Sequence, residues 1–404
     1  MAVSDPTPET VFAFDAVLFD MDGTLVATDR YWPQAAQEGA TRAFEELGLT
    51  AAVPTRAQWM SLVGGELNSG VARLLPDLDE AARQHVLRRC IEAEHAYLAR
   101  GRAGFLPGVE STLARLHDAG LRLGIASNCS FRYLDQIMAD LDLGRWIDEA
   151  RCLDSPRVRS KADMIADLLV TFDTRSAVMV GDRAGDRDAA WANGLPHVHL
   201  ADGYATAGED VAAQVTLNSM GDLPDLLAQR ARDLRALLAE FTPVPDGEVF
   251  TLGVSGDLAS GKTLLARDLA RVWGDPVELI ELESVRRAPN REGVDPLAEA
   301  YDLEALAQRL AQPPRAPARI LEGPMLLDPR LRDLCQAHLY LELPHSLSLM
   351  RVQGRDGRQG LGAVEFAREV LLPWQSQWNA AHAPRELAQR TLLGNNPLRP
   401  LEDG

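Results

Sequence analysis

The stretch that decides the fold of the first half of this chain is Ala16-Val-Leu-Phe-Asp20-Met-Asp22-Gly-Thr24. Four apolar residues of strand type run directly into two carboxylates that are two positions apart and are followed by a turn glycine. Such a pair suits phosphoryl transfer, because one carboxylate can attack phosphorus while the other protonates the leaving oxygen and later activates water. We expect Asp20 to be the nucleophile and Asp22 the general acid and base.

Strand and helix patterns alternate through the rest of this half, which predicts a parallel sheet covered by helices. Two later predicted strands end at Ser127 and just before Asp182. Open sheets of this class bind ligands at the carboxyl ends of their strands, so these side chains should meet the first pair. We expect Asp20, Asp22 and Asp182 to hold a magnesium ion together.

Between about residues 30 and 104 the pattern changes to helical periodicity, interrupted by prolines and a glycine pair. This insertion follows Asp22 directly, so it should lie over the carboxyl edge of the sheet. We expect it to roof the nucleophile and to admit only a small substrate.

A length of 404 residues fits two hydrophobic cores better than one. A proline-containing segment at 242–247 follows a predicted helix at 222–240 and indicates a boundary. We divide the chain into a hydrolase-type α/β domain at 14–228, a linker helix and breaker at 229–247, and a second α/β domain at 248–404.

The motifs of the first half resemble those of the haloacid dehalogenase-like (HAD) hydrolases, over about residues 14–228. The closest resemblance is to phosphatases of the phosphoglycolate phosphatase and β-phosphoglucomutase type, whose helical cap would correspond to about 30–104. The sequence lacks the Lys-Pro-x-Pro run that is common around the lysine of these phosphatases and has Arg159-Ser-Lys161-Ala-Asp163 instead.

This resemblance implies a role for four residues beyond the first pair. Ser127 would hydrogen-bond the phosphoryl oxygens, and Lys161 would steady the charge of an aspartyl-phosphate. Asp182 would bind magnesium, with Asp186 in support. Hydrolysis of a phosphomonoester is the simplest interpretation, and a mutase stays open.

The last third opens with Gly256-Asp-Leu-Ala-Ser260-Gly261-Lys262-Thr263 between a predicted strand and a predicted helix. This is the G-x-x-x-x-G-K-[ST] pattern of the phosphate-binding P-loop. The amides of Gly256, Ser260 and Gly261 would help to cradle the phosphates of ATP, with Lys262 on the β and γ groups and Thr263 on magnesium.

Residues 248–395 resemble the uridine kinase and nicotinamide riboside kinase group, which implies an ATP-dependent kinase with an α/β P-loop fold. By this resemblance Glu283 stands where the group has an aspartate as general base, and the aromatic residue that follows in the group is missing. Arg351 and Arg355, with Arg358, form a cationic cluster that would close over the phosphates. A solvated helix face is the alternative interpretation of that cluster.

Only two of the 41 Lys and Arg residues are lysines, Lys161 and Lys262. Both fall inside the motifs above. Arginine serves almost everywhere else, so each lysine indicates a place that needs a compact ammonium group.

The formal net charge of −18 disfavours nucleic acid and anionic membrane surfaces as partners. Four scattered cysteines form no metal-binding spacing, and no apolar run is long enough for a membrane span. We expect reduced thiols and a cytoplasmic location.

These features predict a bifunctional protein: a magnesium-dependent phosphatase of a small phosphorylated metabolite, fused to a kinase that uses ATP and a small hydroxyl acceptor. One alternative is a polynucleotide 3′-phosphatase and 5′-kinase, and another is a phosphatase with a regulatory nucleotide-binding domain. A non-catalytic scaffold conflicts with two intact motif sets. The sequence leaves open the substrates, whether the sites share a metabolite, and the oligomeric state.

Overall fold

A computed structural model describes residues 12–206, 208–209, 211, 213, 215–241, 249–273, 276–287, 300–313, 315–356, 361–394 and 398. The chain forms two compact units, Asp15–Asp225 and Leu226–Gly404, and the stretch that ends at Phe14 groups with the second. The sequence had placed this division within a separate linker at 229–247. The structure puts it earlier, because helix α9 (Leu223–Leu238) packs mostly as part of the second unit.

The first unit contains a six-stranded sheet in the order β3-β2-β1-β4-β5-β6, and every neighbouring pair is parallel. The strands are β1 (Ala16–Phe19), β2 (Arg122–Ser127), β3 (Glu149–Cys152), β4 (Ala177–Gly181), β5 (His197–Leu200) and β6 (Val215–Leu217). Strand β1 lies between β2 and β4 and is fully buried, which explains its continuous apolar run. All three central strands therefore end at the same edge.

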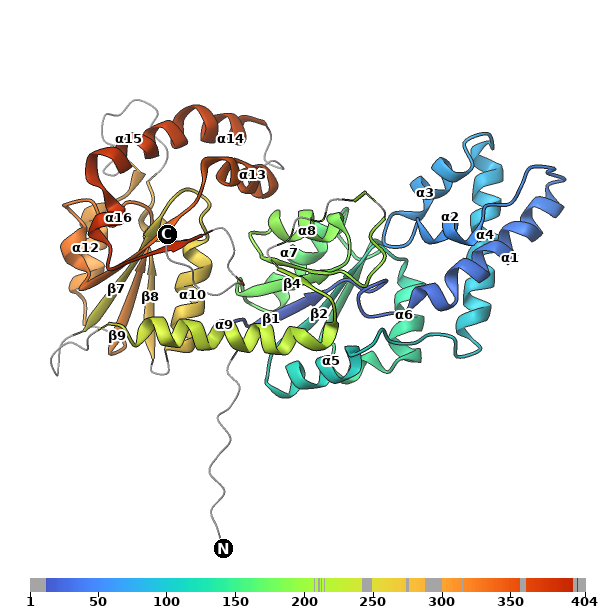
Figure 1. The fold of residues 1–404 in the computed structure, drawn as a ribbon, viewed down its shortest axis with the longest axis horizontal. Coiled ribbons are helices and arrows are strands. Elements are labelled where there is room, and N and C mark those ends of the chain that lie inside the picture. Colours follow the sequence, from blue (N-terminus) through green and yellow to red (C-terminus); the bar gives the residue numbers. More distant parts are fainter. Residues whose placement is uncertain are drawn as a thin grey trace, which may run out of the picture. The chain divides into compact units, whose positions relative to one another are not determined.

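Helices cover the sheet and build a separate cap. The sheet helices are α5 (Val109–Asp118), α6 (Phe131–Asp140), α7 (Lys161–Thr171) and α8 (Ala184–Trp191), with short turns η1 (Thr28–Arg30), η2 (Leu143–Arg145) and η3 (Met220–Asp222). The cap consists of α1 (Trp32–Glu46), α2 (Arg56–Met60), α3 (Leu67–Leu74) and α4 (Glu80–Leu98). Figure 1 shows these four helices together at one side of the first sheet.

The cap has its own packing. Helices α1 and α4 approach so closely that a Cβ on Gly39 would lie 2.3 Å from the carbonyl oxygen of Arg89. The indole N–H of Trp32 donates to the carbonyl oxygen of Trp59 at 3.0 Å, and the two rings meet edge to face. The cap is therefore a packed layer that can position side chains.

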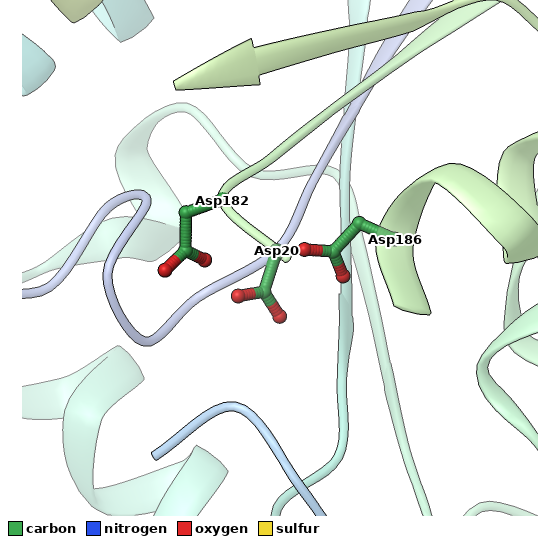
Figure 2. Close-up of side chains that lie close together, drawn as sticks. All are labelled: Asp20, Asp182 and Asp186. Carbon is green, nitrogen blue, oxygen red and sulfur yellow. The ribbon is translucent and has the colours of Figure 1, made fainter. Parts of the chain in front are cut away.

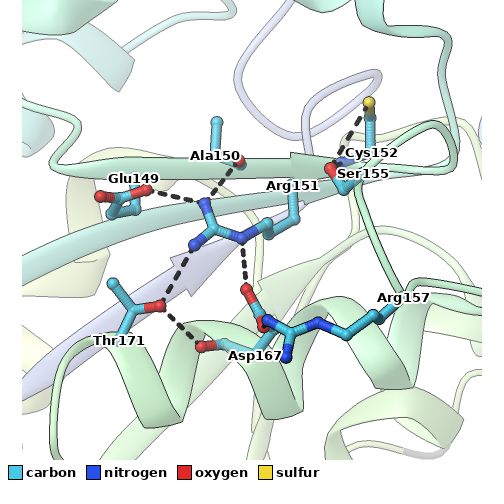
Figure 3. A network of polar contacts seen from close by, with 8 residues as sticks. All are labelled: Glu149, Ala150, Arg151, Cys152, Ser155, Arg157, Asp167 and Thr171. Carbon is cyan, nitrogen blue, oxygen red and sulfur yellow. Dashed lines mark hydrogen bonds and ion pairs between the residues drawn. The ribbon is translucent and has the colours of Figure 1, made fainter.

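Arg151 fixes edge strand β3 against helix α7 (Figure 3). Its guanidinium donates to Asp167 on α7 at 2.6 Å, to Glu149 at 2.7 Å and to the hydroxyl of Thr171 at 3.1 Å. Helix α7 begins at Lys161, after the N-cap residue Ser160. This contact therefore helps to set the position of a predicted site residue.

The second unit contains a five-stranded parallel sheet in the order β11-β10-β7-β9-β8. Its strands are β7 (Phe250–Gly256), β8 (Val277–Glu281), β9 (Ala318–Glu322), β10 (Ala337–Glu342) and β11 (Arg390–Leu393). Its helices and turns are α10 (Lys262–Val272), η4 (Leu282–Val285), α12 (Leu303–Ala311), η5 (Arg332–Leu334), α13 (His345–Asp356), α14 (Leu361–Phe366), the π-helical turn η7 (Ala367–Leu371), α15 (Leu372–His382) and α16 (Pro384–Leu387). The predicted parallel sheet of the first unit is thus present, and the predicted second α/β domain contains a parallel sheet as well.

Across the part of the chain that the structure describes, no helix combines the length and the apolar character that crossing a lipid bilayer requires.

We predict that the buried ion pair between Arg230 on α9 and Asp268 on α10 holds helix α10 in place. The two charged groups lie 3.3 Å apart and are almost completely buried. Asp268→Ala should lower the free energy of unfolding of the second unit by about 3–5 kcal/mol, because it strands a buried guanidinium. Arg385→Ala, which breaks the exposed pair with Glu342, should cost less than about 1 kcal/mol in the same urea titration. Equal losses in the two variants would contradict this role.

Candidate active site

Three buried carboxylates meet at the carboxyl edge of the first sheet (Figure 2). Asp20 follows β1, Asp182 follows β4, and Asp186 lies in the first turn of α8. One oxygen from each lies within 4.8 Å of the others. Oxygen atoms in such a group are the ligands that a hard divalent cation prefers.

Lys161 partly balances this charge. Its ammonium donates to Oδ1 of Asp20 and to Oδ1 of Asp186, both at 2.6 Å. Burial opposes the charged form, but the carboxylates of Asp186 and Asp20 outweigh it and raise the pKa of Lys161 above its ordinary value. Three carboxylates against one ammonium leave two negative charges when all are ionised, which one divalent cation would neutralise.

The second oxygen of Asp20 is the group best placed to react. Oδ2 is buried and accepts no hydrogen bond from any residue that the structure describes, whereas Oδ1 is held by Lys161. Burial raises the pKa of Asp20 well above its ordinary value, and Lys161 pulls it back. A buried oxygen without a partner is costly, so this atom fits a metal ion or a phosphorus atom.

The loop after β1 closely surrounds Asp182. Gly23, the turn glycine of the motif, has a φ of +88°, which disfavours any residue with a Cβ. A Cβ at this position would also lie 2.5 Å from Oδ2 of Asp182, so both the backbone conformation and the available space require glycine. The amide of Tyr204 donates to the same oxygen at 2.5 Å. Burial, and then repulsion from Asp186, raises the pKa of Asp182 to about 7.

Asp22 lies apart from this group, which differs from the predicted metal set. Its Oδ1 accepts hydrogen bonds from the hydroxyls of Thr28 and Tyr133, each at 2.6 Å, and Tyr133 also shares a short hydrogen bond with Tyr31. The sequence predicts Asp22 as a magnesium ligand with Asp20 and Asp182, and Asp186 in support; in the structure it is the side chain of Asp186 that joins Asp20 and Asp182. Burial raises the pKa of Asp22, and the two hydroxyls partly offset the shift. A raised pKa suits a general acid.

A cavity of about 230 Å³ lies between the cap and the part of the sheet edge that carries Asp22 and Ser127. Ser127, buried at the end of β2, and Asp22 line it from the sheet side. The loop between α2 and α3 lines it from the cap side. This loop is held by Asn128, which donates to the carbonyl oxygen of Gly64 at 3.2 Å, and by Arg183, which donates to that of Val63.

The glycine-rich loop Gly256–Thr263 lies in the second unit between β7 and α10, as predicted. Gly261 has a φ of +96° and stands at the N-terminus of α10. The ammonium of Lys262 donates to the carbonyl oxygen of Asp257 at 2.8 Å, and the side chain of Ser260 is buried in the loop. A strand, a loop of this shape and a helix N-terminus are the parts of a phosphate site.

Two further acids of the second unit are Glu322, which contacts the loop, and Glu283, the predicted base. The hydroxyl of Thr263 donates to Oε1 of Glu322 at 3.2 Å, and burial raises the pKa of Glu322. Glu283 is exposed and accepts from the hydroxyl of Tyr301 at 2.9 Å. Burial and then the charge of Glu283 raise the pKa of Tyr301, to which Glu322 contributes as well. Tyr301 is therefore the hydrogen-bond donor that holds the carboxylate of the predicted base.

Of the predicted arginine cluster, the structure describes the side chain of Arg351. Arg351 donates to the carbonyl oxygens of Ala259 and Gly394, at 3.0 and 2.6 Å, so its guanidinium braces the loop. Burial lowers its pKa to about 10. The side chain of Arg355 and the whole of Arg358 lie outside the described residues.

Two residues that line the cavity, Tyr133 and Glu94, were not predicted from the sequence. Tyr133 stands in the first turn of a helix that was predicted only as cover for the sheet, and Glu94 is one of many polar residues on α4. The only available signal was local: Tyr133 follows Ser127 closely on a helix that starts at the carboxyl edge.

Several known proteins are similar to about half of this chain. The chain is 31% identical over 225 residues to a plasmid-encoded phosphoglycolate phosphatase of Cupriavidus necator, a match that covers 52% of this chain and 92% of that protein. It is 28% identical over 229 residues to a phosphoglycolate phosphatase of Salmonella typhi, covering 51% and 90%. The crystal structure of a predicted phosphatase from Clostridium acetobutylicum superposes with a TM-score of 0.46 at 22% identity, covering 54% of this chain and 99% of that one.

The first unit thus combines a parallel sheet, a helical cap and a buried carboxylate group at the carboxyl end of strand β1. Residues 17–199 match the haloacid dehalogenase-like hydrolases, and the chain belongs to this family. Its first unit is a phosphatase of that family.

We predict that Tyr133→Phe shifts the pH dependence of this phosphatase. If Asp22 donates a proton to a poor leaving group, kcat/KM for an alkyl phosphate falls as pH rises through the pKa of Asp22. Loss of the Tyr133 hydroxyl removes a bond that stabilises the carboxylate, so this alkaline limb should move to higher pH. Tyr97→Phe, which removes an exposed hydroxyl on α4, is the control. An alkaline limb of kcat/KM at the same pH in Tyr133→Phe as in the wild type would show that the Tyr133 hydroxyl does not set the pKa of Asp22.

Proposed function

We propose that the first unit is a magnesium-dependent phosphomonoesterase of small phosphorylated metabolites, with Asp20 as its nucleophile. The observation that carries the proposal is the buried, unbonded Oδ2 of Asp20 beside Asp182, Asp186 and Lys161. The donor set is entirely carboxylate with an excess of negative charge, which fits Mg²⁺. When bound there, Mg²⁺ would neutralise charge on the transferring phosphoryl group.

The protein groups divide the reaction into two steps. Oδ2 of Asp20 attacks phosphorus, the ester P–O bond breaks, and Asp22 gives its proton to the departing alcohol. Water then attacks the aspartyl-phosphate, Asp22 takes a proton from that water, and phosphate and the free carboxylate of Asp20 are regenerated. Lys161 would stabilise the charge on the aspartyl-phosphate, and Ser127 would hydrogen-bond a phosphoryl oxygen.

For the second unit we propose ATP binding at Gly256–Thr263 and transfer of the γ-phosphoryl group to a small hydroxyl acceptor. The supporting observations are the strand–loop–helix geometry, Lys262 at the loop, and the contact between Thr263 and Glu322. Glu283 would be the base that accepts the acceptor's proton. Its bond from Tyr301 and its ion pair with Arg286 also fit the alternative, in which bound nucleotide regulates the phosphatase.

The phosphatase proposal predicts that Asp20→Asn abolishes magnesium-dependent hydrolysis of p-nitrophenyl phosphate. Removal of the attacking group should lower kcat by several orders of magnitude. Asp188→Asn, an exposed aspartate on α8, should leave the rate unchanged. Activity of Asp20→Asn above a few per cent of wild type would refute the covalent role.

The two lysines should separate the two activities. Lys262→Arg should impair only ATP-dependent transfer, and Lys161→Arg should impair only phosphate release, because each ammonium would serve its own phosphoryl group. Isothermal titration with ATP and a phosphate-release assay on both variants test this. Wild-type behaviour of Lys262→Arg in ATP binding and transfer would remove the support for a P-loop.

A further inference from the structure

The cavity above Asp22 carries an uneven set of charges. Four carboxylates line it, those of Asp22, Glu66, Glu94 and Asp154, and no Lys or Arg is among its described lining residues. His95 also lines the cavity, and burial followed by the charge of Arg132 lowers its pKa, which favours the neutral ring. The cavity therefore offers no cation to a negatively charged leaving group.

Three of the four carboxylates are already engaged. Asp22 accepts from Thr28 and Tyr133. Glu66 caps helix α3 by accepting from the amides of Asn68 and Ser69, and Asp154 accepts from the amide of Phe131 at 2.8 Å. These groups have fixed structural partners.

Glu94 is the exception. Its residue is only 6% exposed, and among the residues that the structure describes none donates a hydrogen bond to its carboxyl group. It lines the cavity from the cap helix α4 and is close enough to Asp22 to feel its charge. Unlike Oδ2 of Asp20, the carboxyl oxygens of Glu94 are not completely enclosed, so a molecule in the cavity can reach them and donate the missing hydrogen bonds.

We propose, resting on the phosphatase function above, that Glu94 binds hydroxyl groups of the leaving alcohol, and that the substrate is a phosphate ester of a small neutral polyol. A sugar or polyol phosphate would supply the hydroxyl donors that this carboxyl group lacks. A leaving group with its own carboxylate, such as that of phosphoglycolate, would instead meet the carboxylates of Glu66 and Asp154 in a cavity with no Lys or Arg among its described lining residues.

The surroundings of Glu94 favour a neutral partner over an ammonium group. Burial, and then the charge of Asp22, raises the pKa of Glu94 well above its ordinary value, which favours the protonated form. A protonated carboxyl group both donates and accepts, as a hydroxyl group does. Trp32 and Ile91 add apolar surface to the same cavity, which suits the carbon face of a polyol.

The test compares kcat/KM for four substrates with Mg²⁺: glycerol 3-phosphate, glucose 6-phosphate, 2-phosphoglycolate and acetyl phosphate, whose leaving group carries no hydroxyl. The full-length wild type should prefer at least one polyol phosphate over 2-phosphoglycolate by about tenfold or more. Glu94→Leu should lower kcat/KM for that polyol phosphate about tenfold, because its hydroxyl groups bind the carboxyl group of Glu94. The kcat/KM for acetyl phosphate should stay within about threefold of the wild-type value.

Two further variants make the test specific. Glu94→Gln keeps a hydrogen-bond donor and an acceptor, so its kcat/KM for the polyol phosphate should stay within about threefold of the wild-type value. Glu92→Leu removes a 57%-exposed side chain from the same helix and should change nothing.

The outcomes separate the two proposals. Preference of the wild type for 2-phosphoglycolate, or an equal loss on every substrate in Glu94→Leu, would overturn the substrate inference while leaving the phosphatase intact. The wild-type preference decides the matter even if Glu94→Leu fails to fold. No phosphate release from any of the four substrates would instead overturn the proposed function together with the inference.

Discussion

The ammonium of Lys161 lies between two buried carboxylates, and the geometry of the first unit depends on that contact. Without that ammonium group, Asp20 could not remain ionised in its buried place, because desolvation and repulsion from the carboxylate of Asp186 raise the pKa of Asp20. Helix α7 must therefore begin where Lys161 reaches both. Arg151 on β3 contributes by tying that helix to the edge of the sheet. The same contact occupies one oxygen of Asp20 and leaves the other free, which is the asymmetry that a nucleophile requires.

Much of the fold could be predicted because its signals are local. Strand β1 is a short apolar run that leads directly to Asp20, and strand β4 ends directly before Asp182, as predicted. Strands β3, β6 and β11 were missed, because edge strands are short and only partly buried and so lack an apolar run. The glycine-rich loop was found for the same reason as β1: its whole pattern is contiguous.

The site was predictable only where its residues end strands of one sheet. The meeting of Asp20 with Asp182 follows from parallel topology, whereas the choice between Asp22 and Asp186 as the third carboxylate depends on side-chain direction. A turn of α8 brings Asp186 inward, and the hydroxyls of Thr28 and Tyr133 hold Asp22 outside the group. Glu94 could not be found from the sequence. A single glutamate on a polar helix gives no sign that the folded cap buries it at the cavity above the sheet.

Covalent attack by Asp20 is the central claim, and reductive trapping tests it most directly. Borohydride added during steady-state turnover of a phosphomonoester with Mg²⁺ would reduce an aspartyl-phosphate to homoserine, which peptide mass spectrometry can locate. The account predicts homoserine at position 20 only, in a yield that depends on substrate and metal. Turnover without modification of Asp20, or substrate-dependent modification at Asp22, Asp182 or Asp186 instead, would contradict it.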